Sequence, residues 1–196
     1  MKKGLIVLLV VLGALGLAAV FFMGTYNGLV RSEEVVKQAW AQVENVYQRR
    51  LDLIPNLVET VKGYAAHEKS TFVEVTEARS KAAGSISPDI INDPAKFRQF
   101  QESQTALSSA LSRLMVVVEK YPDLKANENF LQLQAQLEGT ENRIAVERGR
   151  FNEASQLFNT MLRQFPTNVL GGMFGFKLKE YFKADAQASV APKVQF

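Results

Sequence analysis

Cysteine is absent from this chain, and histidine occurs once, as His67. The first absence excludes a disulfide framework, a thioether-linked lipid and a thiol nucleophile. The second argues against zinc, since most zinc sites are built from several Cys and His ligands. His67-Glu68 does not begin the H-E-x-x-H motif, because residue 71 is threonine. We therefore expect no metal and no cofactor, with His67 at a helix end.

Sequence motifs of catalysis and of nucleic-acid binding are also missing. The chain has no G-x-S-x-G element, no glycine loop that would hold a phosphate and no calcium-binding loop. Its net charge is +3, of which Lys2 and Lys3 supply two units. The remaining basic residues form no stripe with interleaved aromatic side chains, so nucleic acid is not an expected partner. The sequence favours a protein that is not an enzyme.

One long apolar run stands out near the N-terminus. Residues 4–23 contain no charged side chain, and about 20 such residues suffice for a helix that crosses a bilayer. A cleaved signal peptide is the alternative, with Lys2 and Lys3 as its basic start. Signal peptides, however, have apolar cores of about 7–15 residues followed by a small-x-small cleavage site, whereas this run ends in Phe21-Phe22-Met23. We therefore predict a retained transmembrane helix.

The charges that flank this helix suggest its orientation. Lys2 and Lys3 precede it, and Arg31 and Lys37 follow it at a greater distance. Because Lys and Arg close to the helix ends favour the cytoplasmic side, we expect a cytoplasmic N-terminus. The protein is then a single-pass membrane protein, and its remaining residues form a domain on the extracytoplasmic side.

Helical periodicity dominates the rest of the chain. Apolar residues recur in steps of three and four from Val36 to Val61, which predicts an amphipathic helix. Pro55 lies inside it and predicts a kink near residues 51–55, because proline clashes with the carbonyl four residues earlier. A second helix is expected over about 67–84, followed by a loop over 84–92.

Two further helices follow this loop. Asp93-Pro94 is a favourable helix start, and a heptad pattern from Phe97 runs to a stop at Tyr121-Pro122. A fourth helix is expected from residues 127–129 to Phe165-Pro166. Long helices with short connections predict an all-α fold, an antiparallel up-and-down four-helix bundle. We assign residues 1–26 to the anchor, 27–168 to the bundle and 169–196 to a C-terminal segment and tail.

Polar residues interrupt the apolar seams. Glu141 and Arg148 lie on the seam of the fourth helix, and a buried charge is costly unless it is paired. We therefore predict a polar network drawn from Arg49, Arg50, Asp52, Asn56, Glu141 and Arg148. Such a network either fixes the register of the bundle or forms a ligand-binding or proton-responsive site.

The segment 169–183 mixes aromatic and basic residues. Its candidate contact residues are Phe174, Phe176, Lys177, Lys179, Tyr181 and Phe182. Aromatic side chains facing lipid and lysines facing phosphate would suit a membrane surface. A contact with protein, on the bundle itself or on another subunit, is the alternative. Residues 184–196 have the composition of a turn or linker.

Several stretches together resemble one bacterial family. They are Tyr26-Asn27-x-Leu29-Val30, Ala39-Trp40, Arg49-Arg50-x-Asp52-Leu53-Ile54-Pro55-Asn56-Leu57-Val58, Val61-Lys62-Gly63-Tyr64-Ala65, His67-Glu68, Tyr121-Pro122-x-Leu124-Lys125-Ala126, Gly139-Thr140-Glu141-Asn142-Arg143-Ile144, Arg150-Phe151-Asn152, Phe165-Pro166, Phe174-Gly175-Phe176 and Tyr181-Phe182. Over essentially its whole length the chain resembles the LemA family of membrane-anchored proteins. The resemblance implies an N-terminal membrane helix, a helical bundle and no known enzymatic activity. Phe151 departs from the family, which more often has tyrosine there.

These observations favour a membrane-tethered interaction or assembly module. Gly13 and Gly16 would let two anchors approach closely, so a homo-oligomer in the membrane is expected, with another membrane protein as an alternative partner. A second hypothesis is a lipid-binding or membrane-shaping protein, in which the C-terminal segment makes a second contact with membrane lipids.

Overall fold

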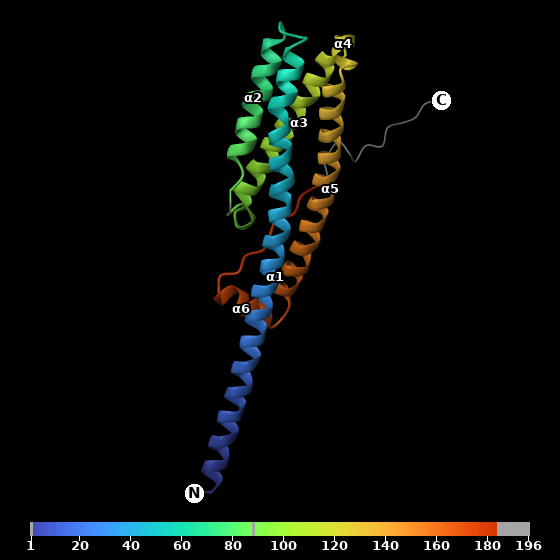
Figure 1. The fold of residues 1–196 in the computed structure, drawn as a ribbon. Helices are drawn as coiled ribbons and strands as arrows, with labels where there is room; N and C mark the ends of the chain where they lie inside the picture. Colours follow the sequence, from blue (N-terminus) through green and yellow to red (C-terminus); the bar gives the residue numbers. More distant parts are fainter. Residues whose placement is uncertain (1, 88, 184–196) are drawn as a thin grey trace, which may run out of the picture.

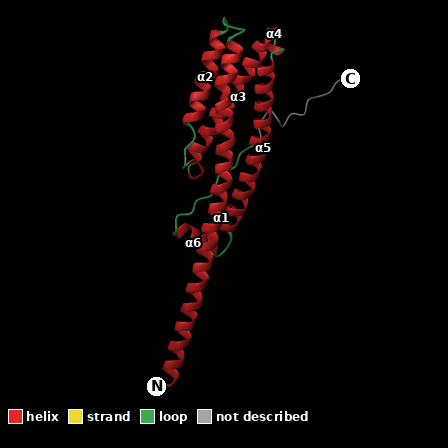
Figure 2. Cartoon of the chain, in the orientation of Figure 1, coloured by secondary structure: helices red, strands yellow, loops and turns green. Residues whose placement is uncertain are grey.

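The computed structural model describes residues 2–87 and 89–183, and these residues form helices and loops without a β-strand. The helices are α1 (Lys2–Lys62), α2 (Lys69–Gly84), the short 3-10 helix η1 (Ile90–Asn92), α3 (Pro94–Val118), α4 (Pro122–Lys125), α5 (Glu128–Arg163) and α6 (Thr167–Met173). The predicted all-helical class with an N-terminal apolar helix is confirmed (Figures 1 and 2). The predicted tail over 184–196 lies outside the described residues.

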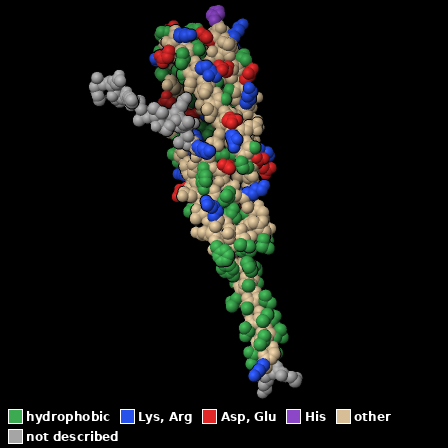
Figure 3. Space-filling model, turned by 180° about the vertical axis from the view of Figure 1, so that it is seen from behind, with side chains coloured by type: hydrophobic (Ala, Val, Ile, Leu, Met, Phe, Trp, Pro, Cys, Tyr) green, Lys and Arg blue, Asp and Glu red, His purple; other side chains and the backbone are tan. Residues whose placement is uncertain are grey.

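Helix α1 runs through most of the length of the molecule. It is 61 residues long, and its N-terminal part extends well beyond the other helices (Figure 1). The large hydrophobic side chains of this projecting part, from Leu5 to Met23, are exposed, and Figure 3 shows them along the face turned to the viewer. A helix that is apolar on every face is suited to lipid, which fits a membrane span by length and composition.

The C-terminal part of α1 belongs to the bundle. There α1 packs mainly against α5 and less extensively against α2, while α2 and α3 form the second close pair. The predicted seam is buried at every apolar position from Val36 to Val61. Pro55 lies within this stretch, and α1 is helical on both sides of it. The kink at this position stays a prediction.

Side-chain caps mark two helix starts that the sequence predicts. Asp93 accepts hydrogen bonds from the backbone N–H groups of Ala95, at 2.9 Å, and Lys96, at 3.2 Å, where Pro94 opens α3. Asn127 accepts one from the N–H of Phe130, at 3.0 Å, at the start of α5. These bonds satisfy amide groups that have no partner inside the helix, so local sequence determines where both helices begin.

The buried apolar side chains form two clusters along the bundle axis. The cluster at the end far from the projecting helix is mainly aliphatic and includes Leu57, Val75 and Leu114. The cluster nearer that helix is rich in aromatic residues and includes Trp40, Phe97 and Phe151. His67 is exposed at the far end of the molecule (Figure 3), on the connection between α1 and α2 that the sequence predicts.

The chain turns back towards the far end of the bundle after α5. Helix α6 lies beside the point where α1 leaves the bundle, and residues 174–183 then return alongside the bundle as an irregular segment (Figure 1). We call this segment the C-terminal strap. Gly175, at its start, has φ +75°, a left-handed conformation that favours glycine.

Candidate functional site

The predicted polar network centres on one buried arginine. The residue Arg50 on α1 is 3% exposed. Its Nε atom lies 2.8 Å from Oε1 of Glu141 on α5, and its Nη2 donates a hydrogen bond of 2.7 Å to the Ser108 hydroxyl on α3. Arg50 therefore links three helices, as expected for a charged group that needs partners when it is buried.

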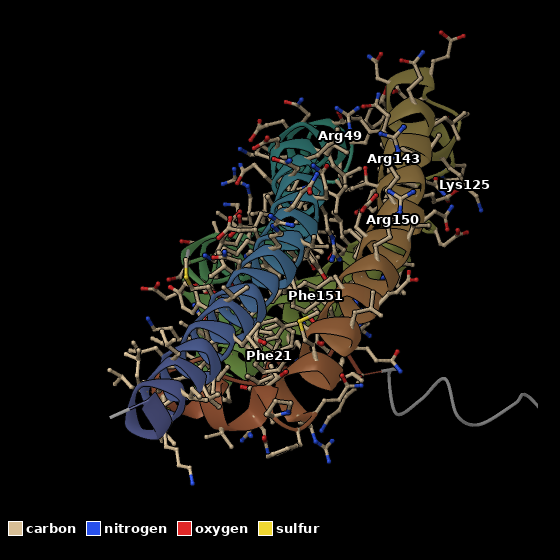
Figure 4. The ribbon with its side chains drawn as sticks, turned by 90° about the horizontal axis from the view of Figure 1, so that it is seen from below. Phe21, Arg49, Lys125, Arg143, Arg150 and Phe151 are labelled. Carbon is tan, nitrogen blue, oxygen red and sulfur yellow. The ribbon has the colours of Figure 1, made fainter. Side chains whose placement is uncertain are left out.

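The other members of the predicted network lie apart from this pair. Asp52 is exposed and accepts a hydrogen bond from Gln48 of its own helix, at 2.8 Å. Arg49 is exposed on α1 (Figure 4), as is Asn56. Arg148 donates to the backbone oxygen of Lys183, at 2.9 Å. The structure thus brings Arg50 and Glu141 together and directs Arg148 to the strap.

The environment of Arg50 affects its protonation. Burial lowers the pKa of this guanidinium from its ordinary value, and the nearby Glu141 carboxylate opposes the change. A base with a lowered pKa in the folded state makes stability rise with pH only between its folded and unfolded pKa values. The upper end of that interval is the ordinary pKa of arginine, so the stability that depends on Arg50 rises with pH as that value is approached from below.

Two asparagines on α5 hold the backbone of the strap. Asn159 donates to the carbonyl of Lys179, at 2.9 Å, and accepts from its N–H, at 2.8 Å. Asn152 makes the same pair of bonds with Phe182, at 2.9 and 2.8 Å. The two asparagines are seven residues apart, so they lie on one face of the helix. Their amides satisfy backbone groups that have no regular secondary structure of their own.

A buried lysine fixes the middle of the strap. The side chain of Lys179 is 0% exposed, and its Nζ lies 2.7 Å from Oε1 of Glu33 on α1. It also donates to the side-chain oxygen of Asn92, at 2.5 Å, and lies 5.2 Å from the centre of the Phe158 ring. The ammonium is therefore paired and hydrogen-bonded, which offsets its loss of water.

Phe182 anchors the end of the strap in the aromatic cluster. Its ring lies 5.0 Å from that of Phe97, 5.6 Å from that of Phe151 and 6.1 Å from that of Trp40. Phe151 lies between α1 and α5 (Figure 4), and the Arg148 guanidinium is 4.8 Å from the centre of the Phe182 ring. Aromatic pairs at these distances add to the free energy gained by burial.

The strap contains most of the residues that the sequence nominates for membrane or partner contact. The structure places Lys179 and Phe182 inside the bundle, so these two side chains contact the protein itself. Phe174, Lys177 and Tyr181 are exposed, and Phe176 is half-buried. A role for the exposed residues in contact with lipid or a partner stays a prediction.

Sequence reasoning did not identify the residues that receive the strap. These are Glu33, Asn92, Asn152 and Asn159. One sequence signal pointed to the two asparagines. They are seven residues apart, and each directly follows a phenylalanine of the apolar seam. Within the described residues, no group of three or more His, Asp or Glu side chains is arranged to hold a metal ion.

A second surface feature surrounds the point where α1 leaves the bundle. The Phe174 ring packs 4.8 Å from that of Tyr26. Around them lies a shallow apolar groove, lined by Phe22, Met23, Tyr26, Asn27, Leu170, Met173 and Phe174. Met173 is 75% exposed and Phe165 83%. We call the exposed apolar residues Phe165, Val169, Met173 and Phe174 the collar.

Comparison with known proteins identifies a family and several relatives. The LemA family matches residues 39–196. Magnetosome protein MamQ 1 of Paramagnetospirillum magneticum is 29% identical over 188 residues, which cover 85% of this chain and 69% of that protein. Magnetosome protein MamQ of Magnetospirillum gryphiswaldense is 27% identical over 201 residues, with 93% and 74% covered. Protein LemA of Metamycoplasma hominis is 26% identical over 180 residues, with 92% and 77% covered. The match covers the network, the strap and the collar together, and it confirms the resemblance seen in the sequence motifs: this chain belongs to the LemA family.

Proposed function

We propose that this protein is a non-enzymatic assembly module, anchored by one membrane helix, that associates with other copies of itself in the membrane. Its bundle stands on the extracytoplasmic side. The observation that carries the proposal is the continuity of α1, which passes from the apolar residues into the bundle core without a break at the predicted boundary of residue 26. The anchor and the bundle are thus one mechanical unit.

This continuity has a consequence for assembly. A helix of 61 residues is about 90 Å long at 1.5 Å per residue. Because no flexible linker separates its two parts, the rotation and tilt of the anchor determine where the bundle faces. Contacts between anchors then hold the bundles of neighbouring copies in a defined arrangement, as an ordered assembly requires.

The anchor offers a face for such contacts. Gly13 and Gly16 are three residues apart, and beyond the adjoining residues and helix backbone no atom of the described chain lies within 4 Å of a Cβ built at either position. Residues three apart share one face of a helix, and small residues on one face allow two membrane helices to pack closely. Gly4 provides a matched control, since nine residues place it about 180° around the helix from Gly13 at 3.6 residues per turn.

The experiment is the mass of the full-length protein in native-like lipid particles. We expect an oligomer of this chain, which Gly13→Ile with Gly16→Ile reduces towards the monomer while Gly4→Ile leaves it unchanged. A monomer without other proteins would overturn the proposal. A particle that contains one copy and a second membrane protein would replace self-assembly with an adaptor role. The MamQ relatives are named as magnetosome proteins, and the proposal takes no cargo or process from that name.

The collar supports a second candidate function, contact with the lipid surface. Its four apolar residues are more than half exposed, and they surround the exit of a helix whose apolar part has the length of a membrane span. Aromatic and aliphatic side chains at this level are stabilised by the interface between headgroups and hydrocarbon. In this arrangement α6 rests on the membrane and keeps the bundle upright.

The absence of cysteine allows a direct test of this contact. A spin label on Met173→Cys in lipid vesicles is expected to be more accessible to oxygen than to a water-soluble nickel chelate. Val116→Cys is the control, because Val116 is also exposed, at 65%, near the far end of α3. Equal preference for the nickel chelate at both positions would exclude the lipid contact without affecting the oligomer measurement.

A further inference from the structure

A polar cleft lies between α1, α3, α5 and the end of the strap. Its volume is about 710 Å³, within the range of sites that hold small molecules. Among the described residues, Arg50, Arg148 and Lys183 line it together with one carboxylate, that of Glu141. The charged side chains at the cleft are thus predominantly cationic.

A buried amide side chain that lines the cleft has no hydrogen-bond partner among the described residues. Gln104 on α3 is 5% exposed, and both its amide nitrogen and its amide oxygen lack a hydrogen bond. Buried amides are nearly always hydrogen-bonded, because an unmade bond leaves the full cost of removing the group from water. Gln104 lines the cleft beside Arg50, which makes the cleft the nearest place from which a partner can reach this amide.

The remaining polar groups define what that partner offers. The hydroxyls of Thr105, Ser108, Ser109 and Ser112 each donate to a carbonyl one turn earlier in α3, at 2.9–3.1 Å. Their protons are used. The oxygens of Thr105, Ser109 and Ser112 remain as acceptors, while that of Ser108 already accepts a hydrogen bond from Arg50. The cleft therefore presents cations at one side and hydrogen-bond acceptors along α3, with Gln104 able to donate and accept between them.

We propose that this cleft binds a small organic anion that also carries hydroxyl groups. Its carboxylate or phosphate pairs with Arg148 and Lys183, since Arg50 already has Glu141 as its partner. Its hydroxyl protons are donated to the serine and threonine oxygens, and the Gln104 amide completes its own bonds with the ligand. Phe182 and Lys183 also line the cleft, so the ligand binds on the docked strap and stabilises it.

The test uses the full-length protein in lipid particles and two probes, gluconate as a hydroxylated carboxylate and glycerol 3-phosphate as a hydroxylated phosphate. Acetate, inorganic phosphate and chloride at equal ionic strength are the references. Saturation-transfer NMR detects the carbon-bound protons of the probes at the protein, and the thermal unfolding midpoint rises when a ligand binds the folded state alone. We expect signal and a higher midpoint with at least one probe.

Matched variants separate the cleft from general salt effects. Gln104→Leu keeps the shape and removes the amide, and Arg148→Gln removes a cation; both are expected to lose at least tenfold in probe affinity. Arg113→Gln removes another arginine of α3, one that is paired with Glu74 of α2. This variant is expected to bind the probes as the unaltered chain does. No signal from either probe, or equal binding by Gln104→Leu, would show a cleft filled by water alone and overturn the proposal.

Discussion

The pair formed by Glu33 and Lys179 predicts an unequal response to removal of either charge. The described polar partners of the Lys179 ammonium are the Glu33 carboxylate and the neutral Asn92 side chain. In Glu33→Gln the ammonium stays buried but loses the one counter-charge among these partners. A hydrogen bond to a charged group contributes about 1.5–3 kcal/mol. We therefore expect the strap to detach more easily by that amount.

Lys179→Met is expected to be milder although it removes the same pair. Methionine keeps an apolar stem against Phe158 and leaves no buried charge. Glu33 then remains with a side chain that is 20% exposed and 4.0 Å from Lys37, so it stays partly solvated. Replacement of a buried ion pair by apolar groups is often neutral, and we expect a cost of at most about 1 kcal/mol.

Hydrogen exchange of the strap measures both effects. The N–H groups of Lys179 and Phe182 are protected by Asn159 and Asn152, and they exchange when the strap opens. Since 1.4 kcal/mol corresponds to a factor of ten, Glu33→Gln should accelerate their exchange roughly 10- to 100-fold, and Lys179→Met less than about fivefold.

A neighbouring carboxylate supplies the control. Glu34 pairs with Lys37 at 2.7 Å and its side chain is 61% exposed, so Glu34→Gln should leave strap exchange unchanged because exposed pairs contribute little. Faster exchange in Lys179→Met than in Glu33→Gln would refute the reasoning. So would equal exchange in Glu33→Gln and Glu34→Gln, since the buried pair would then not hold the strap.

Two other predictions concern the core of the bundle and the end near the membrane helix. Glu141→Gln leaves the Arg50 guanidinium buried without its carboxylate and should lower the free energy of unfolding by about 1–3 kcal/mol. Adding Arg50→Met should recover most of this loss. Chemical denaturation of both variants measures the free energy of unfolding, and a further loss in the double variant would contradict the expectation. In α6, a Cβ at Gly171 would approach Leu162 Cδ1 too closely, while Gly172 has open space. Gly171→Ala should therefore destabilise the docking of α6 by about 1 kcal/mol, and Gly172→Ala should stabilise it by up to about 1 kcal/mol. Hydrogen exchange of the α6 amides distinguishes the two variants. Equal effects would mean that Leu162 does not confine Gly171.

Local sequence patterns were sufficient to predict the long helices. The apolar seam of α1, the Asp93-Pro94 start of α3 and the Asn127 cap of α5 depend on residues within one or two turns of each other, so periodicity and capping rules reveal them. The apolar run of α1 is equally local. The short helices α4 and α6 were not predicted, because segments of 4 and 7 residues carry no usable period.

The polar network was predictable only in part. Arg50 and Glu141 were nominated together because both interrupt or flank an apolar seam, and the structure pairs them. Arg49, Asp52 and Asn56 flank the same region but face outward. A difference of one position along a helix rotates a side chain by about 100°, so a sequence motif can contain one buried residue and several exposed ones.

The sequence by itself determined the N-terminal apolar helix, the helical class and the family, since each depends on composition, period or motif. Only the tertiary structure decided that the strap packs on the bundle with Lys179 buried. In the sequence, Lys179 and its aromatic neighbours suggest a lysine that contacts lipid phosphate. In the structure Lys179 pairs instead with Glu33, which is 146 residues away along the chain. No local pattern encodes that distance. A charge on a short irregular segment is buried only where distant elements supply its counter-charge and hydrogen bonds, and α1 and η1 supply them here.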